Sequence, residues 1–258
     1  MSFMRRGPNT TLSRSYQTGC LRVRLPRRLE SDRPCAVLIN TSGGLAEGDR
    51  LSQHIAWETG SRGIVTTQAA EKVYRALADG CEIATKIDVA AHAEAEWLPQ
   101  ETILFDRARL RRDIQVVLGE NASFLGVEAV VLGRTAMGER MREGMLSDSV
   151  RITRDGRLIY ADRLRLDSAV EQLMARRAIG NGSCAMAVIL YVAAKAGALL
   201  DPLRQALERA GGLVAASCWN GILAVRMLAP DGATLRRDLA AALAVLRSGR
   251  PLPRVWNC

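Results

Sequence analysis

The amino-acid sequence predicts a mainly β protein, in which stacked antiparallel β layers form a β-helix-like body that carries a small C-terminal α/β portion. One observation is a weak repeat of about 30 residues, whose units begin at Trp57, Val89 and Leu118. The other is a change of pattern after Asp167, where helical periodicity becomes frequent. We therefore expect a body over residues 1–168 and an α/β portion over residues 169–258, packed together as one continuous domain.

Each unit of the repeat contains an apolar strand end, a turn residue, a second apolar strand, a Gln or Glu, and then an arginine. The turn residues tolerate a left-handed backbone; they are Gly60, His92 and Asn121. Stacking of such units buries a continuous core between layers. It would also align one polar residue per unit in a row, namely Gln68, Gln100 and Glu128. The arginines are Arg75, Arg107 and Arg134. Chance similarity among short β-hairpins is the alternative explanation.

A glycine-rich loop follows an early strand of the body. Residues 35–39 form an apolar, partly β-branched run that predicts a strand, and the polar and glycine residues after it predict a turn. Gly43 and Gly44 permit positive φ or a close backbone approach, so Glu47 and Asp49 can be held at the rim of the strand. The loop lacks the Gly-Lys-Ser/Thr ending of a phosphate-binding P-loop. A plain hairpin, in which Asp49 only caps the turn, is the alternative.

The second half of the chain predicts a hairpin and then alternating strands and helices. Apolar and charged residues alternate on both sides of Asp155-Gly156, which is the pattern of a β-hairpin. Buried strands are expected at residues 185–192 and 222–228. The expected helices cover residues 170–178, 202–210 and 234–246, the second with Asp201 as its N-cap and Pro202 at its first position.

The composition argues against several classes of function. The formal net charge is +9, but the arginines are spread along the chain and aromatic residues make up only 4%. Few aromatic residues make a poor platform for stacking nucleic-acid bases. No apolar run reaches the roughly 20 residues of a membrane-spanning helix, and the six cysteines contain no Cys-x-x-Cys pair. We therefore expect a cytoplasmic protein that binds neither nucleic acid nor membrane.

Patterns of catalysis and of tight metal binding are also missing. The histidines are His54 and His92 alone, and their spacing is not that of metal ligands. Any divalent metal would meet mainly oxygen ligands, which hold nickel more weakly than imidazole or thiolate does. Glu71 could be read as a general acid, but the neighbouring Lys72 and Arg75 would lower its pKa and not raise it toward neutrality. A salt-bridged network with a structural or docking role is therefore expected at Glu71, Lys72, Tyr74 and Arg75.

Five stretches, spaced along nearly the whole chain, carry a more specific signal in combination than any one of them does alone. They are NTSGGLAEGDR (residues 40–50), TTQAAEKVYR (66–75), EWLPQETILFD (96–106), LGRTAMGER (132–140) and PLPRVW (251–256). Together and in this order, they resemble the urease accessory protein D family, called UreD or UreH.

The resemblance implies a non-enzymatic scaffold. Such a protein docks on the urease apoprotein, recruits the accessory proteins F and G, of which G is a GTPase, and conducts nickel to the urease active site. It implies no tightly bound cofactor, with Ni²⁺ as transient cargo, and it leaves a homodimer within the complex open. The residues implied in docking are Gly43, Gly44, Gln68, Glu71, Lys72, Tyr74, Arg75, Gln100, Glu101 and Arg134.

Two carboxylates are implied as weak sites for metal in transit, Asp49 and Asp162. Family members usually carry Glu where Asp162 stands, so the carboxylate here is one methylene shorter. We expect both carboxylates in the interior or at a channel mouth, each beside an arginine or a backbone amide, because a buried unpartnered carboxylate is costly. The alternative from another class is a metal-dependent or phosphate-handling enzyme centred on the stretch from Asn40 to Arg75.

Overall fold

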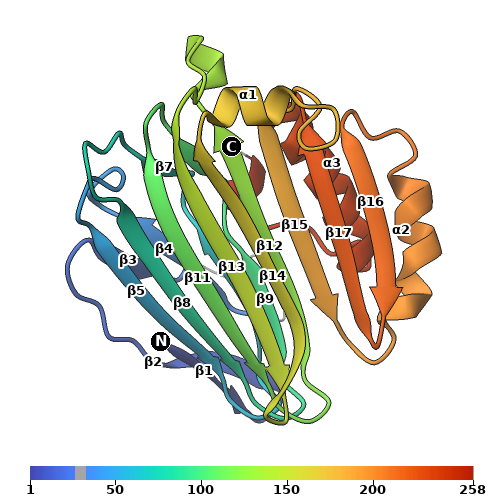
Figure 1. Ribbon diagram of the computed structural model, residues 1–258. Helices are drawn as coiled ribbons and strands as arrows, with labels where there is room; N and C mark the ends of the chain where they lie inside the picture. The colour runs from blue at the N-terminus through green and yellow to red at the C-terminus, as the bar shows by residue number, and fades with distance from the viewer. Residues whose placement is uncertain (27–32, 258) are drawn as a thin grey trace.

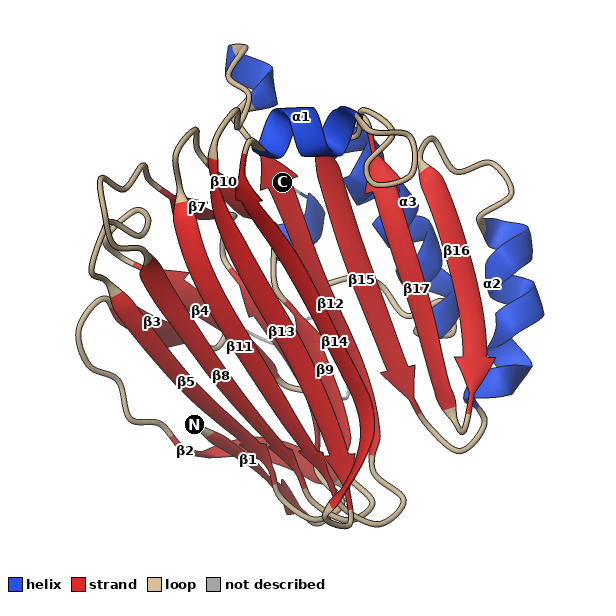
Figure 2. Cartoon of the chain, viewed as in Figure 1, coloured by secondary structure: helices blue, strands red, loops and turns tan. Residues whose placement is uncertain are grey.

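The computed structural model describes residues 1–26 and 33–257, which form two large β-sheets that face each other (Figure 1). Strands dominate the described chain, and its α-helices all follow residue 169 (Figure 2). The chain winds back and forth between the two sheets as a β-solenoid. The helices at Leu200–Ala206 and Gly232–Leu246 lie against the outer side of the ten-stranded sheet, and the helix at Val170–Ala175 lies across one end of the body. The predicted mainly β fold with a β-helix-like body and a small C-terminal helical portion is confirmed.

The strand orders show how the two sheets are built. Across the described residues, the seven-stranded sheet consists of β14 (Arg157–Ser168), β13 (Gly144–Arg154), β11 (Arg109–Leu118), β8 (Cys81–Val89), β5 (Arg50–Trp57), β1 (Ser2–Arg6) and β2 (Asn9–Arg14). The ten-stranded sheet consists of β16 (Leu213–Trp219), β17 (Ile222–Ala229), β15 (Ala185–Val192), β12 (Ser123–Leu132), β9 (Glu94–Leu98), β6 (Arg62–Thr67), β4 (Cys35–Asn40) and β3 (Leu21–Arg24), joined by β10 (Thr102–Leu104) and β7 (Glu71–Val73).

Strand direction in the solenoid differs from the expected antiparallel layers. Strands β5, β8, β11 and β13 pair in parallel, and so do β4, β6, β9 and β12. Each coil contributes one strand to each sheet, so equivalent strands of successive coils run the same way. Alternating apolar residues report which face of a strand is buried and carry no information on its direction. Antiparallel pairs occur at the margins, for example between β13 and β14 and between β12 and β15.

The repeat of the sequence is confirmed by the turns between coils. All three predicted turn residues have left-handed backbone, with φ of 66° at Gly60, 58° at His92 and 52° at Asn121. The turns also stack on one another. The Gly60 N–H donates to the Ala91 oxygen at 3.0 Å, and the His92 N–H donates to the Glu120 oxygen at 2.9 Å. Equivalent positions of the repeat therefore occupy equivalent places in space.

The expected row of Gln68, Gln100 and Glu128 is wrong in its third member. Strand β12 pairs with β9 so that Gly126 lies opposite Trp97, which leaves Glu128 one residue out of register with Gln100. Because side chains of a strand alternate between its faces, this offset turns Glu128 to the opposite side. Glu128 points between the two sheets, whereas Gln100 points toward the C-terminal segment.

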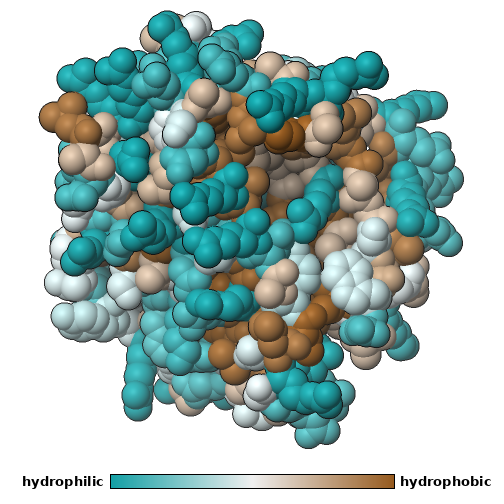
Figure 3. Space-filling model, viewed as in Figure 1, coloured by the Kyte–Doolittle hydropathy of each residue, from teal (hydrophilic) through white to brown (hydrophobic). Residues whose placement is uncertain are grey.

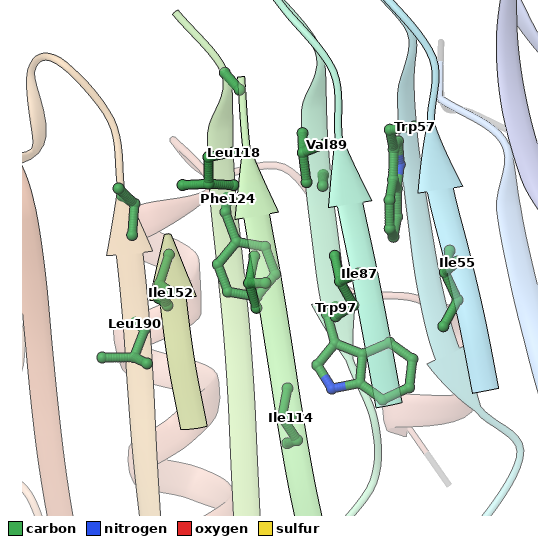
Figure 4. Packing of buried hydrophobic residues seen from close by; sticks show 14 of the residues in the cluster. Ile55, Trp57, Ile87, Val89, Trp97, Ile114, Leu118, Phe124, Ile152 and Leu190 are labelled. Atoms are coloured by element: carbon green, nitrogen blue, oxygen red, sulfur yellow. The ribbon is translucent and has the colours of Figure 1, made fainter. Parts of the chain in front are cut away.

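The main core lies between the two sheets of the solenoid. Side chains at equivalent positions of successive coils stack there, as Trp57, Val89 and Leu118 do (Figure 4). Burial of each large apolar side chain contributes about 1.5–3 kcal/mol. A second core lies between the ten-stranded sheet and the helices, and it includes Leu203 and Leu239. The body is therefore packed with side chains along its length.

The C-terminal residues continue the ten-stranded sheet and add helices to it. The helices are α1 (Val170–Ala175), α2 (Leu200–Ala206) and α3 (Gly232–Leu246), with short 3-10 turns η1 (Thr135–Met137), η2 (Ala196–Leu199) and η3 (Arg254–Asn257). Asp231 caps α3 by accepting the Thr234 N–H at 2.7 Å. The expected cap of α2 at Asp201 is wrong, because η2 runs directly into a helix that already begins at Leu200. No helix among the described residues is both long and apolar enough to cross a membrane.

Candidate functional site

One end of the solenoid gathers the loops that the sequence singled out. Arg50, Glu82 and Arg111 lie side by side near the starts of β5, β8 and β11. The segments before these strands therefore lie at the same end of the sheet. We call residues 41–49, 74–80, 105–108 and 133–143 the loop end. It is the upper end of the seven-stranded sheet in Figure 1, beside β7 and α1.

Gly44 lets the first loop lie directly against β7. A Cβ atom at this position would come within 2.8 Å of both the Lys72 carbonyl oxygen and the Tyr74 ring, so a side chain has no room. The close approach lets the Leu45 N–H donate to the Lys72 oxygen at 2.7 Å. The Tyr74 hydroxyl donates to the Gly43 oxygen at 3.1 Å. The structure thus brings Gly43, Gly44, Lys72 and Tyr74 together.

Glu47 fixes the loop that precedes β8. Its carboxylate accepts hydrogen bonds from the backbone N–H groups of Leu77, Ala78 and Asp79 at 2.9, 2.9 and 2.6 Å. These bonds favour the ionised form, so the pKa of Glu47 lies below its ordinary value. One exposed carboxylate therefore holds three successive residues of this loop in a single arrangement.

Three side chains from successive coils stack on the loop end. The rings of Tyr74 and Phe105 meet edge to face with their centroids 5.2 Å apart, and the Arg134 guanidinium lies 4.4 Å from the centre of the Phe105 ring. Arg134 also pairs with Glu139 at 2.8 Å. The stack thereby ties together the loops that follow β7, β10 and β12.

The expected salt-bridged network around Glu71 is wrong. Glu71 and Lys72 are consecutive in β7 and so point to opposite faces. In the part of the chain that the structure describes, neither Lys72 nor Arg75 pairs with Glu71. Glu71 instead accepts a hydrogen bond from the Asn40 side-chain amide at 3.0 Å. Burial raises the pKa of Glu71, and the bond from Asn40 opposes that rise. Lys72 and Arg75 extend into solvent.

Gln100 and Glu101 bind the C-terminal segment and not the loop end. The Gln100 side-chain nitrogen donates to the Val255 oxygen at 3.1 Å, and its oxygen accepts from Arg236 at 2.6 Å. Arg236 also pairs with Glu101 at 3.4 Å. Gln68 lies exposed after β6, and its side chain forms no hydrogen bond among the described residues. The predicted docking residues therefore fall into two separate groups.

Asp49 lies on the surface of the loop end, so the expectation of an interior position is wrong for this residue. Its carboxylate accepts the Ala46 N–H at 2.8 Å, which is the turn-capping arrangement that the sequence offered as the alternative. The bond closes the glycine-rich loop on its solvent side. Asp49 is thus exposed, and its amide partner lies within its own loop.

Asp162 lies at the rim between the two sheets and is partly buried. It accepts hydrogen bonds from the Arg226 guanidinium at 2.7 Å, the Tyr160 hydroxyl at 3.2 Å and the Arg163 N–H at 2.9 Å. Arg226 belongs to β17, so the ion pair joins the edge strand β14 of one sheet to the other sheet. The expected arginine neighbour is present, but it comes from far along the chain.

A buried arginine lies between two carboxylates inside the solenoid. Arg112 of β11 pairs with Glu128 of β12 at 2.7 Å and with Asp148 of β13 at 2.6 Å. The Trp97 indole N–H donates to Glu128 at 2.7 Å. Burial raises the pKa of Glu128 to about 7, while the positive charge of Arg112 opposes that rise. The cluster carries one positive charge between two acidic groups.

A second buried charge cluster joins the ten-stranded sheet to the chain after α3. Glu96 of β9 pairs with Arg247 at 2.7 Å and with Arg250 at 2.7 Å. The Arg247 side chain is almost fully buried, and it also donates to the backbone oxygens of Arg250 and Pro251. Glu96 therefore anchors the segment that leads to the C-terminus.

Metal-binding clusters are absent from the part of the chain that the structure describes, where no three His, Cys, Asp or Glu side chains are grouped to hold an ion. The His54 ring pairs with Asp88 at 2.6 Å on the outer face of the seven-stranded sheet. His92 forms the turn described above. The geometry of the described residues therefore offers separate carboxylates and no preformed chelate.

Similarity to known proteins covers nearly the full length of the chain. The profile of the UreD urease accessory protein family matches residues 1–257. The chain belongs to this family. A urease accessory protein UreD from Rhizobium leguminosarum bv. viciae is 46% identical over 248 residues, covering 96% of this chain and 90% of the relative. One from Xanthobacter autotrophicus is 48% identical over 253 residues, covering 97% and 86%.

Membership in the UreD family decides between the two classes of function that the sequence left open. UreD proteins are accessory proteins of urease maturation and not catalysts. The alternative of an enzyme centred on the stretch from Asn40 to Arg75 is therefore excluded. The resemblance of the five sequence stretches to the UreD family is confirmed.

Sequence reasoning missed the buried charges of this UreD-family chain, although strand β11 contained a signal for one of them. Apolar residues occupy alternate positions from Leu110 to Leu118, and Arg112 interrupts this series. Asp148 interrupts the same kind of series in β13. A charge at an inward position of a strand indicates a buried ion pair, because an unpaired buried charge is too costly.

Proposed function

We propose that this chain is a urease maturation scaffold that docks on the urease apoprotein, recruits the accessory proteins F and G, and conducts nickel to the urease active site. The observation that carries the proposal is the UreD family match over residues 1–257, which includes every stretch on which the resemblance rests. The fold supports it, because a stacked solenoid gives a rigid body with loops at its ends, and loops held by a rigid body commonly bind partners.

Docking is assigned to the loop end in this proposal. Its members from the predicted set are Gly43, Gly44, Tyr74, Arg75 and Arg134, and Lys72 of β7 lies directly against Gly44. Glu71 acts indirectly, because its hydrogen bond to Asn40 holds β7 against the end of β4. Gln100 and Glu101 act indirectly through Arg236, which holds the C-terminal segment in place. Gln68 lies exposed. The stack of Tyr74, Phe105 and Arg134 supports this assignment because it keeps three loops in a fixed relation.

Nickel is proposed to pass this chain as weakly held cargo, with Asp49 and Asp162 as transit ligands. Carboxylate oxygens bind nickel less strongly than imidazole or thiolate does, and weak ligands allow release to the next site. A cation that reaches Asp162 must replace the Arg226 guanidinium, which lies 2.7 Å from the carboxylate. This exchange of one positive charge for another would keep Asp162 compensated throughout.

Replacing both transit carboxylates tests this proposal. The double variant Asp49→Ala/Asp162→Ala is expected to fold and to co-purify with urease and proteins F and G, while the nickel content and activity of the urease fall. Asp49 caps only its own loop and Asp162 is partly exposed, so neither change opens the core. The measurement is nickel per urease active site in cells that carry each form of the chain.

Each other outcome of this experiment has a distinct meaning. Loss of co-purification would make the two carboxylates structural or docking groups. Unchanged nickel loading would remove them from the nickel path. Asp113→Ala is a suitable control, because Asp113 also pairs with an arginine, Arg151, at 3.0 Å, but on the outer face of the seven-stranded sheet.

A further inference from the structure

Positive charge is concentrated in residues 1–26. This stretch contains five arginines and no Asp, Glu or Lys, whereas the formal net charge of the whole chain is +9. The five are Arg5, Arg6, Arg14, Arg22 and Arg24. More than half of the net charge of the chain therefore comes from this short stretch.

The five arginines lie on three strands at one end of the solenoid. Arg5 and Arg6 belong to β1, Arg14 belongs to β2, and Arg22 and Arg24 belong to β3. Strand β2 is an edge strand of the seven-stranded sheet, and β3 is an edge strand of the ten-stranded sheet. We call these three strands the basic end. They lie at the left and lower left of Figure 1, and hydrophilic side chains cover the surface over β1 and β2 (Figure 3).

The guanidinium groups of the basic end have no acidic partners. None of the five arginines forms an ion pair with a described residue. Where they donate hydrogen bonds, the acceptors are backbone oxygens, for example that of Gly7 at 2.9 Å from the Arg5 side chain. A guanidinium without a carboxylate can still form a bidentate, charge-assisted pair. The basic end therefore offers arginines that an acidic surface can engage.

Acidic residues next to the basic end do not balance its charge. Glu58 adjoins it, and a serine hydroxyl of β2 donates to the Glu58 carboxylate at 2.9 Å. Glu94 already lies between two arginines, Arg62 at 2.9 Å and Arg33 at 2.5 Å. Strand β4, which pairs with β3, contains no charged residue. In the sequence, residues 27–32 add two arginines and two acidic residues, a net charge of zero. Positive charge therefore predominates at this end.

The strands of the basic end favour a protein as the partner. Strand β2 pairs with β1 and with no other described strand, so its second side can receive a strand of another protein. A nucleic acid or a lipid headgroup has no backbone that pairs in this way. Tyr16 is the one exposed aromatic side chain among residues 1–26, which is too little for stacking of bases. A second copy of the chain would bring identical arginines together and is repelled.

We propose that the basic end binds an acidic protein surface, whose carboxylates pair with the arginines of β1, β2 and β3. The inference rests on the proposed function, since it takes the acidic protein to be urease, protein F or protein G. It adds a contact surface other than the loop end and the chemistry of the partner there. Arginines that face carboxylates across an interface speed association and make it specific.

The test measures binding of the purified full-length chain to the urease apoprotein and to proteins F and G, alone and combined. The variant Arg14→Glu/Arg24→Glu places anions on both edge strands and is expected to bind one of these proteins at least about tenfold more weakly than the unmodified chain. Arg14→Lys/Arg24→Lys keeps the positive charge and should lose less. The matched control is Arg157→Glu/Arg209→Glu, which changes the net charge equally at two exposed arginines outside the basic end.

The control should bind every protein as the unmodified chain does. Affinity of the unmodified chain should also fall as salt rises from about 50 to 300 mM, and more steeply than that of the Glu variant.

Three results would contradict the inference. Equal affinities of the Glu variant and the control would overturn it while leaving the proposed function intact. Tighter binding to duplex DNA or to phosphatidylserine vesicles than to any of the proteins, lost in the Glu variant, would overturn an acidic protein as the partner. If the unmodified chain binds neither urease nor proteins F and G, the proposed function itself is wrong and the inference falls with it.

Discussion

Arg112→Met is expected to lower the free energy of unfolding by about 3–5 kcal/mol, because it leaves Glu128 and Asp148 as uncompensated buried carboxylates. Arg112 and Glu128 are buried between the sheets and the Asp148 side chain is only 11% exposed, so solvent compensates little for the lost guanidinium. Chemical denaturation of the purified chain measures the change. Arg111→Met is the matched control: Arg111 is the preceding residue of the same strand, points outward and forms an exposed pair with Glu82, which is worth about 1 kcal/mol or less.

The loss in Arg112→Met should be larger at about pH 8 than at about pH 5. Burial raises the pKa of Glu128 to about 7, above its ordinary value of 4.5. Because the pKa of Glu128 is higher in the folded than in the unfolded state, its contribution to stability is fully present below its unfolded-state pKa. That contribution is lost as the pH rises through its folded-state pKa. Arg112 opposes the rise, so its removal penalises mainly the ionised form at high pH. An equal loss at both pH values would contradict the assigned charge cluster.

Glu96→Gln is expected to lower the free energy of unfolding by about 3 kcal/mol and to expose the C-terminal segment to proteases. The change keeps the side-chain volume but removes the negative charge that compensates Arg247 and Arg250. Arg247 is nearly fully buried and cannot turn to solvent without moving the end of α3. Denaturant unfolding gives the energy, and limited proteolysis after residue 247 reports detachment.

The control for this prediction is Glu82→Gln. Glu82 also faces two arginines, Arg50 at 3.5 Å and Arg111 at 3.3 Å, but all three side chains are exposed on the outer face of the sheet. Solvent screens such pairs, so the change should cost about 1 kcal/mol or less. Equal effects of the two substitutions would show that Glu96 does not anchor the C-terminal segment.

The architecture could be predicted from the sequence because two features recur in each repeat unit, a turn residue that tolerates a left-handed backbone and apolar residues at the core positions. The left-handed turns at Gly60, His92 and Asn121 identified the coils. Strand direction could not be predicted, since apolar alternation is the same in parallel and antiparallel strands. Strand β16 (Leu213–Trp219) was missed because Ala215, Ala216 and Ser217 give a weak β signal. Pairing with β17 places this segment in the sheet despite its low propensity.

The candidate site was predicted in part for equally specific reasons. The glycines of the loop indicated a close backbone approach, and the structure shows that Gly44 makes it against Lys72 and Tyr74, neighbours that the sequence did not identify. The Glu71 network failed because consecutive strand residues point to opposite faces. The ion-pair partner of Asp162 is Arg226, which comes from another strand far along the chain. A single sequence contains no spacing rule that brings such residues together.

The nickel content of urease from cells that lack this chain tests the central claim most directly. We expect that urease purified from such cells contains all its subunits but little nickel and little activity, and that restoring the chain restores both. The comparison should be made at equal urease expression and equal nickel in the medium, with protein F and the GTPase G still present. Urease that is fully loaded with nickel without this chain would contradict the proposal that it is a scaffold required for nickel delivery.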